Sequence, residues 1–159
     1  MTSLTTTLFR IDTDTGLKDV VALTTPEEAK VRGLSQQAIV GAFDELVESG
    51  TFPPERFVQN PGFVRVLHSV IKEHAPTSPA LRREAERLAQ GWVYVIDRRC
   101  ATPGDRVPPE DILGVFAVRS GAALSASYTP SPNYRLLTQR GFFQLEEHLV
   151  PHLLAAVRS

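Results

Sequence analysis

The chain has little cysteine and no long apolar stretch, the features that are typical of secreted and membrane proteins. Its single cysteine, Cys100, cannot form an internal disulfide bond, and such a chain is typical of a reducing compartment. The N-terminus lacks the basic segment and apolar run of a secretory signal. The longest apolar stretch, residues 145–157, contains two glutamates and two histidines and is too short to span a bilayer. We therefore expect a cytoplasmic protein that does not bind membranes.

The common catalytic and cofactor motifs are also missing. The sequence has no glycine-rich phosphate loop, no CxxC pair, no HExxH and no GxSxG. These absences weigh against the common nucleotide-binding, zinc and hydrolase classes, and no cofactor is predicted. The formal net charge of -1 provides no overall field that would attract nucleic acid. A nucleic-acid partner is therefore not predicted.

What the chain does contain is the composition of an ordinary globular domain. Its 159 residues are 42% hydrophobic and 22% charged, which is enough to bury a core in one domain. We divide this single domain, residues 1–159, into four parts. These are a β-hairpin over residues 1–24, a helical part over 25–90, a β-meander over 91–138 and a C-terminal helix over 139–159.

The N-terminal half is predicted to form a hairpin followed by four helices. Threonine-rich runs at 5–11 and 17–23 predict two strands around a loop at 12–16. Thr25 and Pro26 begin a short helix that Gly33 ends. Apolar residues at helical spacing predict a second helix over 35–49. Asn60 begins a third helix and Ser78 a fourth, each followed by proline.

After Gly91 the apolar period changes from that of a helix to that of a strand. Strands are predicted over 92–98, 112–119 and 122–128, with a short one over 134–137. A final helix is predicted over 142–158, kinked or split by Pro151. Because the first two strands are apolar on both faces, we expect a sheet that is covered on both sides. The predicted class is α+β, an antiparallel sheet of three to five strands packed by N-terminal helices and a C-terminal helix.

Charged residues collect in the loop between the two most apolar strands. The candidate binding residues, from this loop and the later proline-rich loop at 129–135, are Asp97, Arg98, Arg99, Asp105, Arg106, Tyr134 and Arg135. Arginine forks in such a loop can grip a carboxylate or a phosphate. The alternative is that these side chains are solvated strand ends joined by weak surface ion pairs. The two loops together are the partner surface that we predict.

Glu146 is the candidate catalytic residue. On a helix over 142–158 it falls within a stripe of leucine and valine side chains, where a carboxylate must be paired or must titrate upward. It is then either a general acid or base in a partly dry pocket, or a structural ion pair with Arg135. A third interpretation is that Pro151 changes the helix phase and exposes Glu146.

His148 and His152 are the candidate metal ligands, because their spacing of four residues points both rings to one side of a continuous helix. Two ligands are too few for a metal site, and Pro151 disturbs the geometry. His68 and His74 can contribute only if their helix packs alongside. Solvated histidines are the alternative, and no metal is predicted.

The aromatic residues of the C-terminal half, which alternate with valine, isoleucine and leucine, are Trp92, Tyr94, Phe116, Tyr128 and Tyr134. They can line a ligand pocket or stack on bases, but ordinary sheet core fits their alternation better. Cys100 follows two arginines and has no histidine close to it in the sequence, so we interpret it as an incidental thiol.

Because no catalytic set converges, we predict a non-enzymatic, cytosolic protein-binding module, such as an accessory, adaptor or immunity-type protein. The alternative is a small-molecule-binding protein or an enzyme. Its pocket would lie between the sheet and the C-terminal helix, with polar contacts from Glu146, Arg135 and Tyr134. A flat exposed apolar patch favours the protein partner, and a deep apolar pocket beside Glu146 favours the small molecule.

Overall fold

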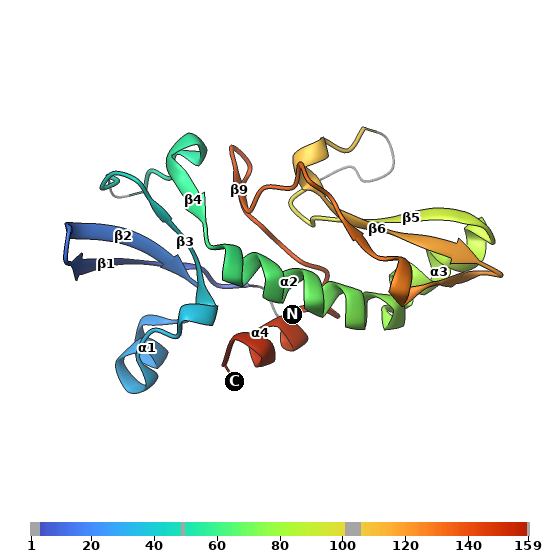
Figure 1. Ribbon diagram of the computed structural model, residues 1–159, viewed down its shortest axis with the longest axis horizontal. Coiled ribbons are helices and arrows are strands. Elements are labelled where there is room, and N and C mark those ends of the chain that lie inside the picture. The colour runs from blue at the N-terminus through green and yellow to red at the C-terminus, as the bar shows by residue number, and fades with distance from the viewer. Residues whose placement is uncertain (1–3, 49, 101–105, 159) are drawn as a thin grey trace.

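The computed structural model describes residues 4–48, 50–100 and 106–158. The fold is of the α+β class, as predicted, with helices packed on antiparallel sheets. Two four-stranded sheets lie toward opposite ends of the long axis of the molecule, and the longest helix runs between them (Figure 1). The predicted antiparallel sheet of three to five strands is present, and the structure adds another sheet, to which the N-terminal hairpin belongs.

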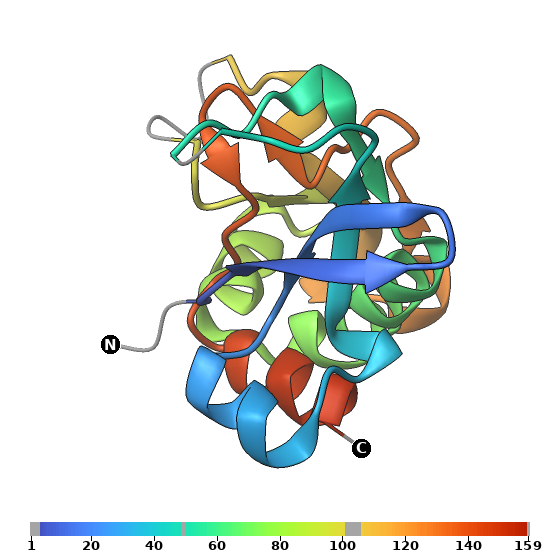
Figure 2. The same cartoon turned by 90° about the vertical axis from the view of Figure 1, so that its left-hand side faces the viewer.

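The first sheet is formed by the N-terminal third of the chain. Its strands are β1 (Thr7–Thr13), β2 (Gly16–Ala22), β3 (Ile39–Phe43) and β4 (Phe57–Gln59), paired antiparallel in that order. The hairpin between β1 and β2 confirms the prediction, with Thr13 paired to Gly16 across the turn. In Figure 2, where this sheet is nearest the viewer, β1 and β2 cross in front of the helices.

The predicted helix over 35–49 is wrong. The segment contains a short 3-10 turn (Gln36–Ala38) and then β3, which pairs with β2 on one side and β4 on the other. Two β-branched residues, Ile39 and Val40, start the strand, and Gly41 lets β4 approach closely. A Cβ atom on Gly41 would lie 2.4 Å from the Val58 carbonyl oxygen. Tertiary pairing therefore outweighs the helical spacing of the apolar residues.

Three predicted helices are confirmed with their caps. They are α1 (Pro26–Arg32), α2 (Pro61–His74) and α3 (Pro79–Leu88). In each, the preceding residue accepts a hydrogen bond from a backbone N–H of the first turn, through the side chain of Thr25, Asn60 or Ser78. Helix α2 buries Phe63, Leu67, Val70 and Ile71, most of its predicted stripe.

The last helix is shorter than predicted. Helix α4 (Val150–Arg158) begins where Pro151 occupies the first turn, so the proline starts the helix and does not kink it. Residues 143–149 precede the helix as an irregular segment that contributes Phe143, Leu145 and Leu149 to the core. Helix α4 packs beside α2 (Figure 1). The stripe predicted for a longer helix, which included Glu146, therefore does not form.

The second sheet follows Gly91. Strand β6 (Ile112–Arg119) is central and pairs with β5 (Gly91–Ile96), β7 (Ala122–Ala123) and β8 (Thr129–Pro130). Of the strand predicted over 122–128 only β7 forms, because a 3-10 turn (Ser125–Ser127) follows it, and β8 comes after the predicted end. A small hairpin of β9 (Leu137–Thr138) and β10 (Gly141–Phe142) lies between the two large sheets (Figure 1). Further 3-10 turns span Pro54–Arg56, Ala75–Thr77 and Pro109–Asp111.

The second sheet is covered on one face only. Val93 and Val95 of β5 are buried, whereas Trp92 and Tyr94, which alternate with them, are 59% and 54% exposed. The prediction that both apolar strands are covered on both sides is therefore wrong for β5, and the prediction of core positions for these two aromatics is wrong with it. Phe116 is buried in β6, as expected of sheet core, whereas Tyr134 is buried in the irregular segment before β9, where a strand was predicted over 134–137.

One cluster of buried apolar side chains runs from Leu4 to Val157 and includes residues of both sheets, α2, α3 and α4. Among the described residues, no helix is both long and apolar enough to cross a membrane.

Candidate functional site

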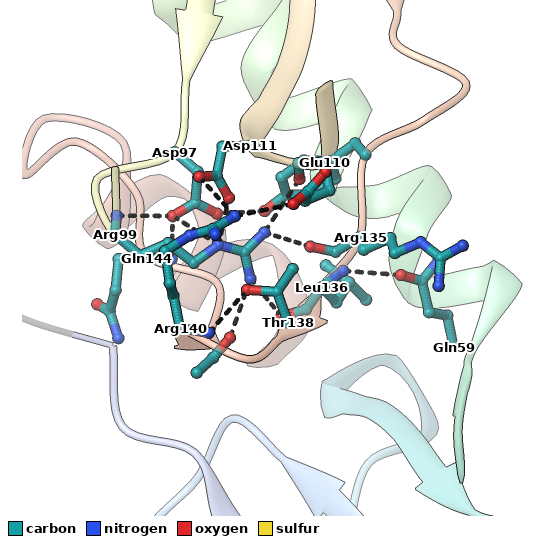
Figure 3. A network of polar contacts seen from close by, with 12 residues as sticks. Gln59, Asp97, Arg99, Glu110, Asp111, Arg135, Leu136, Thr138, Arg140 and Gln144 are labelled. Carbon is teal, nitrogen blue, oxygen red and sulfur yellow. Dashed lines mark hydrogen bonds and ion pairs between the residues drawn. The ribbon is translucent and has the colours of Figure 1, made fainter. Parts of the chain in front are cut away.

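The predicted binding loop contains a buried arginine whose donors are all used. The Arg99 side chain is 3% exposed. Its Nε donates to Asp111 at 2.9 Å, and its Nη1 and Nη2 donate to backbone carbonyl oxygens, those of Leu136, Gly141, Glu110 and Arg135 (Figure 3). A guanidinium group has five N–H donors, so Arg99 has none left for a ligand.

Asp97 is the second buried charge of this network. Its carboxylate accepts hydrogen bonds from the Tyr134 hydroxyl at 2.6 Å, from the Arg99 backbone N–H at 2.9 Å and from the Gln144 backbone N–H at 3.0 Å. Burial raises the pKa of Asp97, while Arg99 and these hydrogen bonds oppose the rise. Burial also raises the pKa of Tyr134, so its hydroxyl remains a donor.

Asp111 completes the network. One carboxylate oxygen accepts from Arg99, and the other lies 3.0 Å from Nη2 of Arg140 in an ion pair. That guanidinium also binds the Glu110 carboxylate at 3.0 Å. Three segments distant in the sequence, at 97–99, 110–111 and 134–144, are thus held together by one set of charges (Figure 3).

The structure divides the predicted binding residues into two groups. Asp97, Arg99 and Tyr134 meet in the buried network, whereas the side chains of Arg98, Arg106 and Arg135 are exposed and outside it. Asp105 lies outside the described residues. The three buried members hold loops in place, because their polar groups are satisfied within the protein. The alternative of weak surface ion pairs is also wrong for Arg99, which is buried.

The two predicted partner loops do border a common hollow. It has a volume of about 620 Å³ and lies between the sheets. Its lining includes three prolines and two aromatic residues, which are Pro54, Pro109, Pro132, Phe57 and Tyr134. The hollow is open to solvent, and Arg135 also lines it.

Glu146 lies at a different place. Its carboxylate accepts a hydrogen bond from the hydroxyl of Ser78, and Ser78 is the residue that caps α3. Arg135, the predicted partner, lies at the hollow described above, and Glu146 lies on the wall of a cleft of about 390 Å³ between α3 and β5. The three polar residues proposed for one small-molecule pocket are therefore split between two depressions. The contact with Ser78 makes Glu146 part of a helix-cap arrangement.

Three of the four histidines, His74, His148 and His152, lie together. His152 lies on His74 with ring centroids 3.6 Å apart and planes at 8°, so α2 and α4 do pack alongside each other. His148 precedes α4, and its Nε2 lies 2.9 Å from the Thr77 hydroxyl oxygen. The continuous helix that would aim His148 and His152 at one metal is therefore not present. The described residues contain no cluster of three or more histidine, cysteine or acidic side chains arranged to hold a metal ion.

This histidine packing predicts acid sensitivity. Burial, together with His74 and His148, lowers the pKa of His152, and burial lowers the pKa of His68, whose Nδ1 contacts the Tyr128 hydroxyl. The unfolded chain therefore binds more protons below the ordinary histidine pKa of 6.5. Above about pH 7 these histidines do not reduce the free energy of unfolding. This free energy falls as the pH drops from about 6.5 through the lower pKa values that the two histidines have in the folded protein.

Urea unfolding measured from about pH 7.5 to 5.5 checks this expectation. The double variant His68→Gln/His152→Gln should show a flatter dependence of unfolding free energy on pH. An equally steep dependence in the variant would contradict the assignment to these two rings.

The exposed aromatic pair is the feature that the sequence did not reveal. Trp92 and Tyr94 project from β5 on the face opposite Val93 and Val95, beside the half-buried Val115 of β6, which is the cross-strand partner of Tyr94. Exposed Trp and Tyr side chains are enriched at protein interfaces. A strictly alternating interpretation of residues 92–99 would have placed Trp92 and Tyr94 on one face and Asp97 and Arg99 on the other, without saying which face is covered.

Comparison of the chain with family models, curated proteins and solved structures finds no match. The function must therefore be argued from the geometry.

Proposed function

We propose that the protein is a non-enzymatic protein-binding module, and that its partner contacts the exposed face of the second sheet around Trp92 and Tyr94. One observation carries the proposal. The only tryptophan of the chain and a neighbouring tyrosine are more than half exposed on a regular strand. Large aromatic side chains bury much apolar surface when a partner covers them. They therefore contribute much of the binding free energy at many protein interfaces.

The other candidate sites support the same conclusion. The buried charges around Arg99 are saturated within the protein, and Glu146 is engaged by Ser78. Two hydroxyls lie beside a possible base, Ser78 beside Glu146 and Tyr128 beside His68, but Ser78 is fully buried and serves as the cap of α3. The cleft of about 390 Å³ between α3 and β5 is large enough for a small ligand. A small-molecule ligand ranks second, because the polar residues predicted for its pocket do not meet there. The single cysteine supports a cytoplasmic location.

Affinity purification from cells that produce the protein tests the proposal. Wild-type protein is compared with the double variant Trp92→Ser/Tyr94→Ser and with a matched control, Leu17→Ser/Val58→Ser, whose residues are 56% and 59% exposed on the first sheet. Partners that bind through β5 should be lost from the first variant, at least about tenfold, and retained by the control. Equal capture by all three proteins would contradict the proposed surface.

A further inference from the structure

Strand β5 is an edge of the second sheet, since β6 is the only described strand that pairs with it. The direction of its backbone groups follows from β6. The Ala117 backbone N–H donates to the Ser127 hydroxyl oxygen, and the Ala117 carbonyl accepts from the Leu124 backbone N–H. The polar groups of Ala117 therefore point away from β5. Because this direction alternates along a strand, those of Phe116 and Val118 point toward β5.

The partners of Phe116 and Val118 on β5 are Val93 and Gly91. Their N–H and C=O groups are thus used in the pair with β6. The alternate residues, Trp92 and Tyr94, direct their N–H and C=O groups to the opposite side, where no described strand lies. The free edge of β5 therefore presents two donors and two acceptors next to two exposed aromatic side chains.

The strand itself carries none of the usual protection, and the cleft of about 390 Å³ separates its edge from α3. Natural edge strands are usually protected by charged side chains, proline or a bulge. The segment Gly91–Ile96 contains no charged residue and no proline. The irregularity of pairing between Val95 and Ile96 leaves the stretch from Gly91 to Val95 in regular register with β6. A regular, uncharged and aromatic edge of this kind is suited to pairing with another strand.

We propose that the occupant of this edge is β5 of a second copy of the chain, paired antiparallel about a two-fold axis at Val93. In that register Trp92 of each copy lies opposite Tyr94 of the other. Each such pair exchanges two hydrogen bonds, from each N–H to the opposite C=O. All the outward-facing groups of Trp92 and Tyr94 in both copies are then satisfied. This self-complementarity favours a second copy over an unrelated strand, since a closed two-fold contact uses one patch twice.

The side chains fit the same arrangement. Trp92 and Tyr94 lie on one face, so each Trp meets the Tyr of the other copy as a cross-strand aromatic pair. Val95 of each copy lies opposite Gly91, where a side chain would meet nothing within 4 Å. The dimer would join the two exposed faces into one aromatic surface. Self-association goes beyond the proposed partner binding and does not depend on it.

Sedimentation velocity of the purified full chain at low and high micromolar concentration tests the contact. The wild-type protein should dimerise, and the fluorescence of Trp92, the only tryptophan, should shift to shorter wavelength as it does so. Tyr94→Ala and Tyr94→Pro both remove the ring, but only the proline removes the outward N–H. Tyr94→Pro should weaken the dimer by about tenfold or more beyond Tyr94→Ala, because each copy loses a donor. Circular dichroism establishes that both variants are folded.

Disulfide cross-linking tests the register. In a Cys100→Ser background, Val93→Cys places a thiol on the two-fold axis, and Val118→Cys places one at an equally buried position of β6. Oxidation should cross-link the first variant as a dimer and not the second. If Val93→Cys misfolds, the difference between Tyr94→Pro and Tyr94→Ala decides the proposal.

A wild-type protein that stays monomeric at high micromolar concentration overturns the inference, as does a dimer that Tyr94→Pro leaves intact. A monomer that still captures partners through Trp92 and Tyr94 overturns self-association alone and leaves the proposed function standing.

Discussion

Replacing Arg99 by methionine is expected to destabilise the protein by about 3–5 kcal/mol, the range found when one partner of a buried ion pair is removed. The substitution keeps an unbranched side chain of similar shape but removes all five donors. Asp111 then keeps only Arg140, and four carbonyl oxygens lose a donor. Each buried polar group left without a partner costs about 1–3 kcal/mol. Urea unfolding followed by circular dichroism measures the loss.

The adjacent residue supplies the control. Arg98 has the same side chain but is exposed, so Arg98→Met should change the unfolding free energy by no more than about 0.5 kcal/mol. Arg99→Lys keeps the charge and offers at most three donors, so its effect should fall between the two. If Arg99→Met lies beyond the reach of the measurement because the chain does not fold, Arg99→Lys still separates the two positions. Equal effects of the variants at 98 and 99 would refute the structural role of Arg99.

Arg98 and Arg99 also show what the sequence could and could not predict. Strands β5 and β6 and helices α2 and α3 were predictable, because period and caps agree with the packing. Which arginine is buried depends on which face of β5 is covered. From the sequence both faces of β5 are apolar, because Trp92 and Tyr94 on one face and Val93 and Val95 on the other are all hydrophobic. The sequence therefore does not indicate which face is covered. Only the packing of α3 and the core against one face assigns Val93, Val95, Asp97 and Arg99 to the inside.

The failures have a common physical cause. Residues 39–43 form a strand because β2 and β4 lie on either side, and this depends on residues far away in the sequence. Gly41 was the local sign of such close approach, since a side chain there would collide with Val58 and Phe57. Likewise, Pro151 was compatible with a kink or with a helix start. The buried segment before it, held through Gln144 and Phe143, determines that the helix starts there.

Asp19 is the buried charge that sequence reasoning missed, and Asp19→Ala is expected to cost about 2 kcal/mol, as hydrogen bonds to charged groups typically do. The carboxylate is fully buried in β2. It accepts two hydrogen bonds from its cross-strand neighbour Arg10, at 2.9 and 3.0 Å, and one from the Val47 backbone N–H at 2.8 Å. The cost should be below that at Arg99, because the Arg10 side chain is 47% exposed and regains water.

The contribution of Asp19 to stability should decrease at acid pH. Hydrogen bonding to Arg10 lowers the pKa of Asp19 below its ordinary 3.8, against the effect of burial. The carboxylate therefore stabilises the fold fully above about pH 5, and this contribution disappears as the pH falls through the folded-state value. Asp19→Ala should lose that part of the acid sensitivity, and Asp12→Ala, at an exposed position of the same hairpin, should retain it.

A double-mutant cycle with Arg10→Met measures how far Asp19 acts through Arg10, whose guanidinium also donates to the Val47 carbonyl oxygen. If the carboxylate acts mainly through Arg10, the two substitutions together should cost clearly less than the sum of their separate effects. Additive costs would mean that the loop around Val47, and not the cross-strand pair, is what Asp19 holds. Since that loop joins β3 to β4, Asp19 would then stabilise the closure of the first sheet, a role that the hairpin alone does not require.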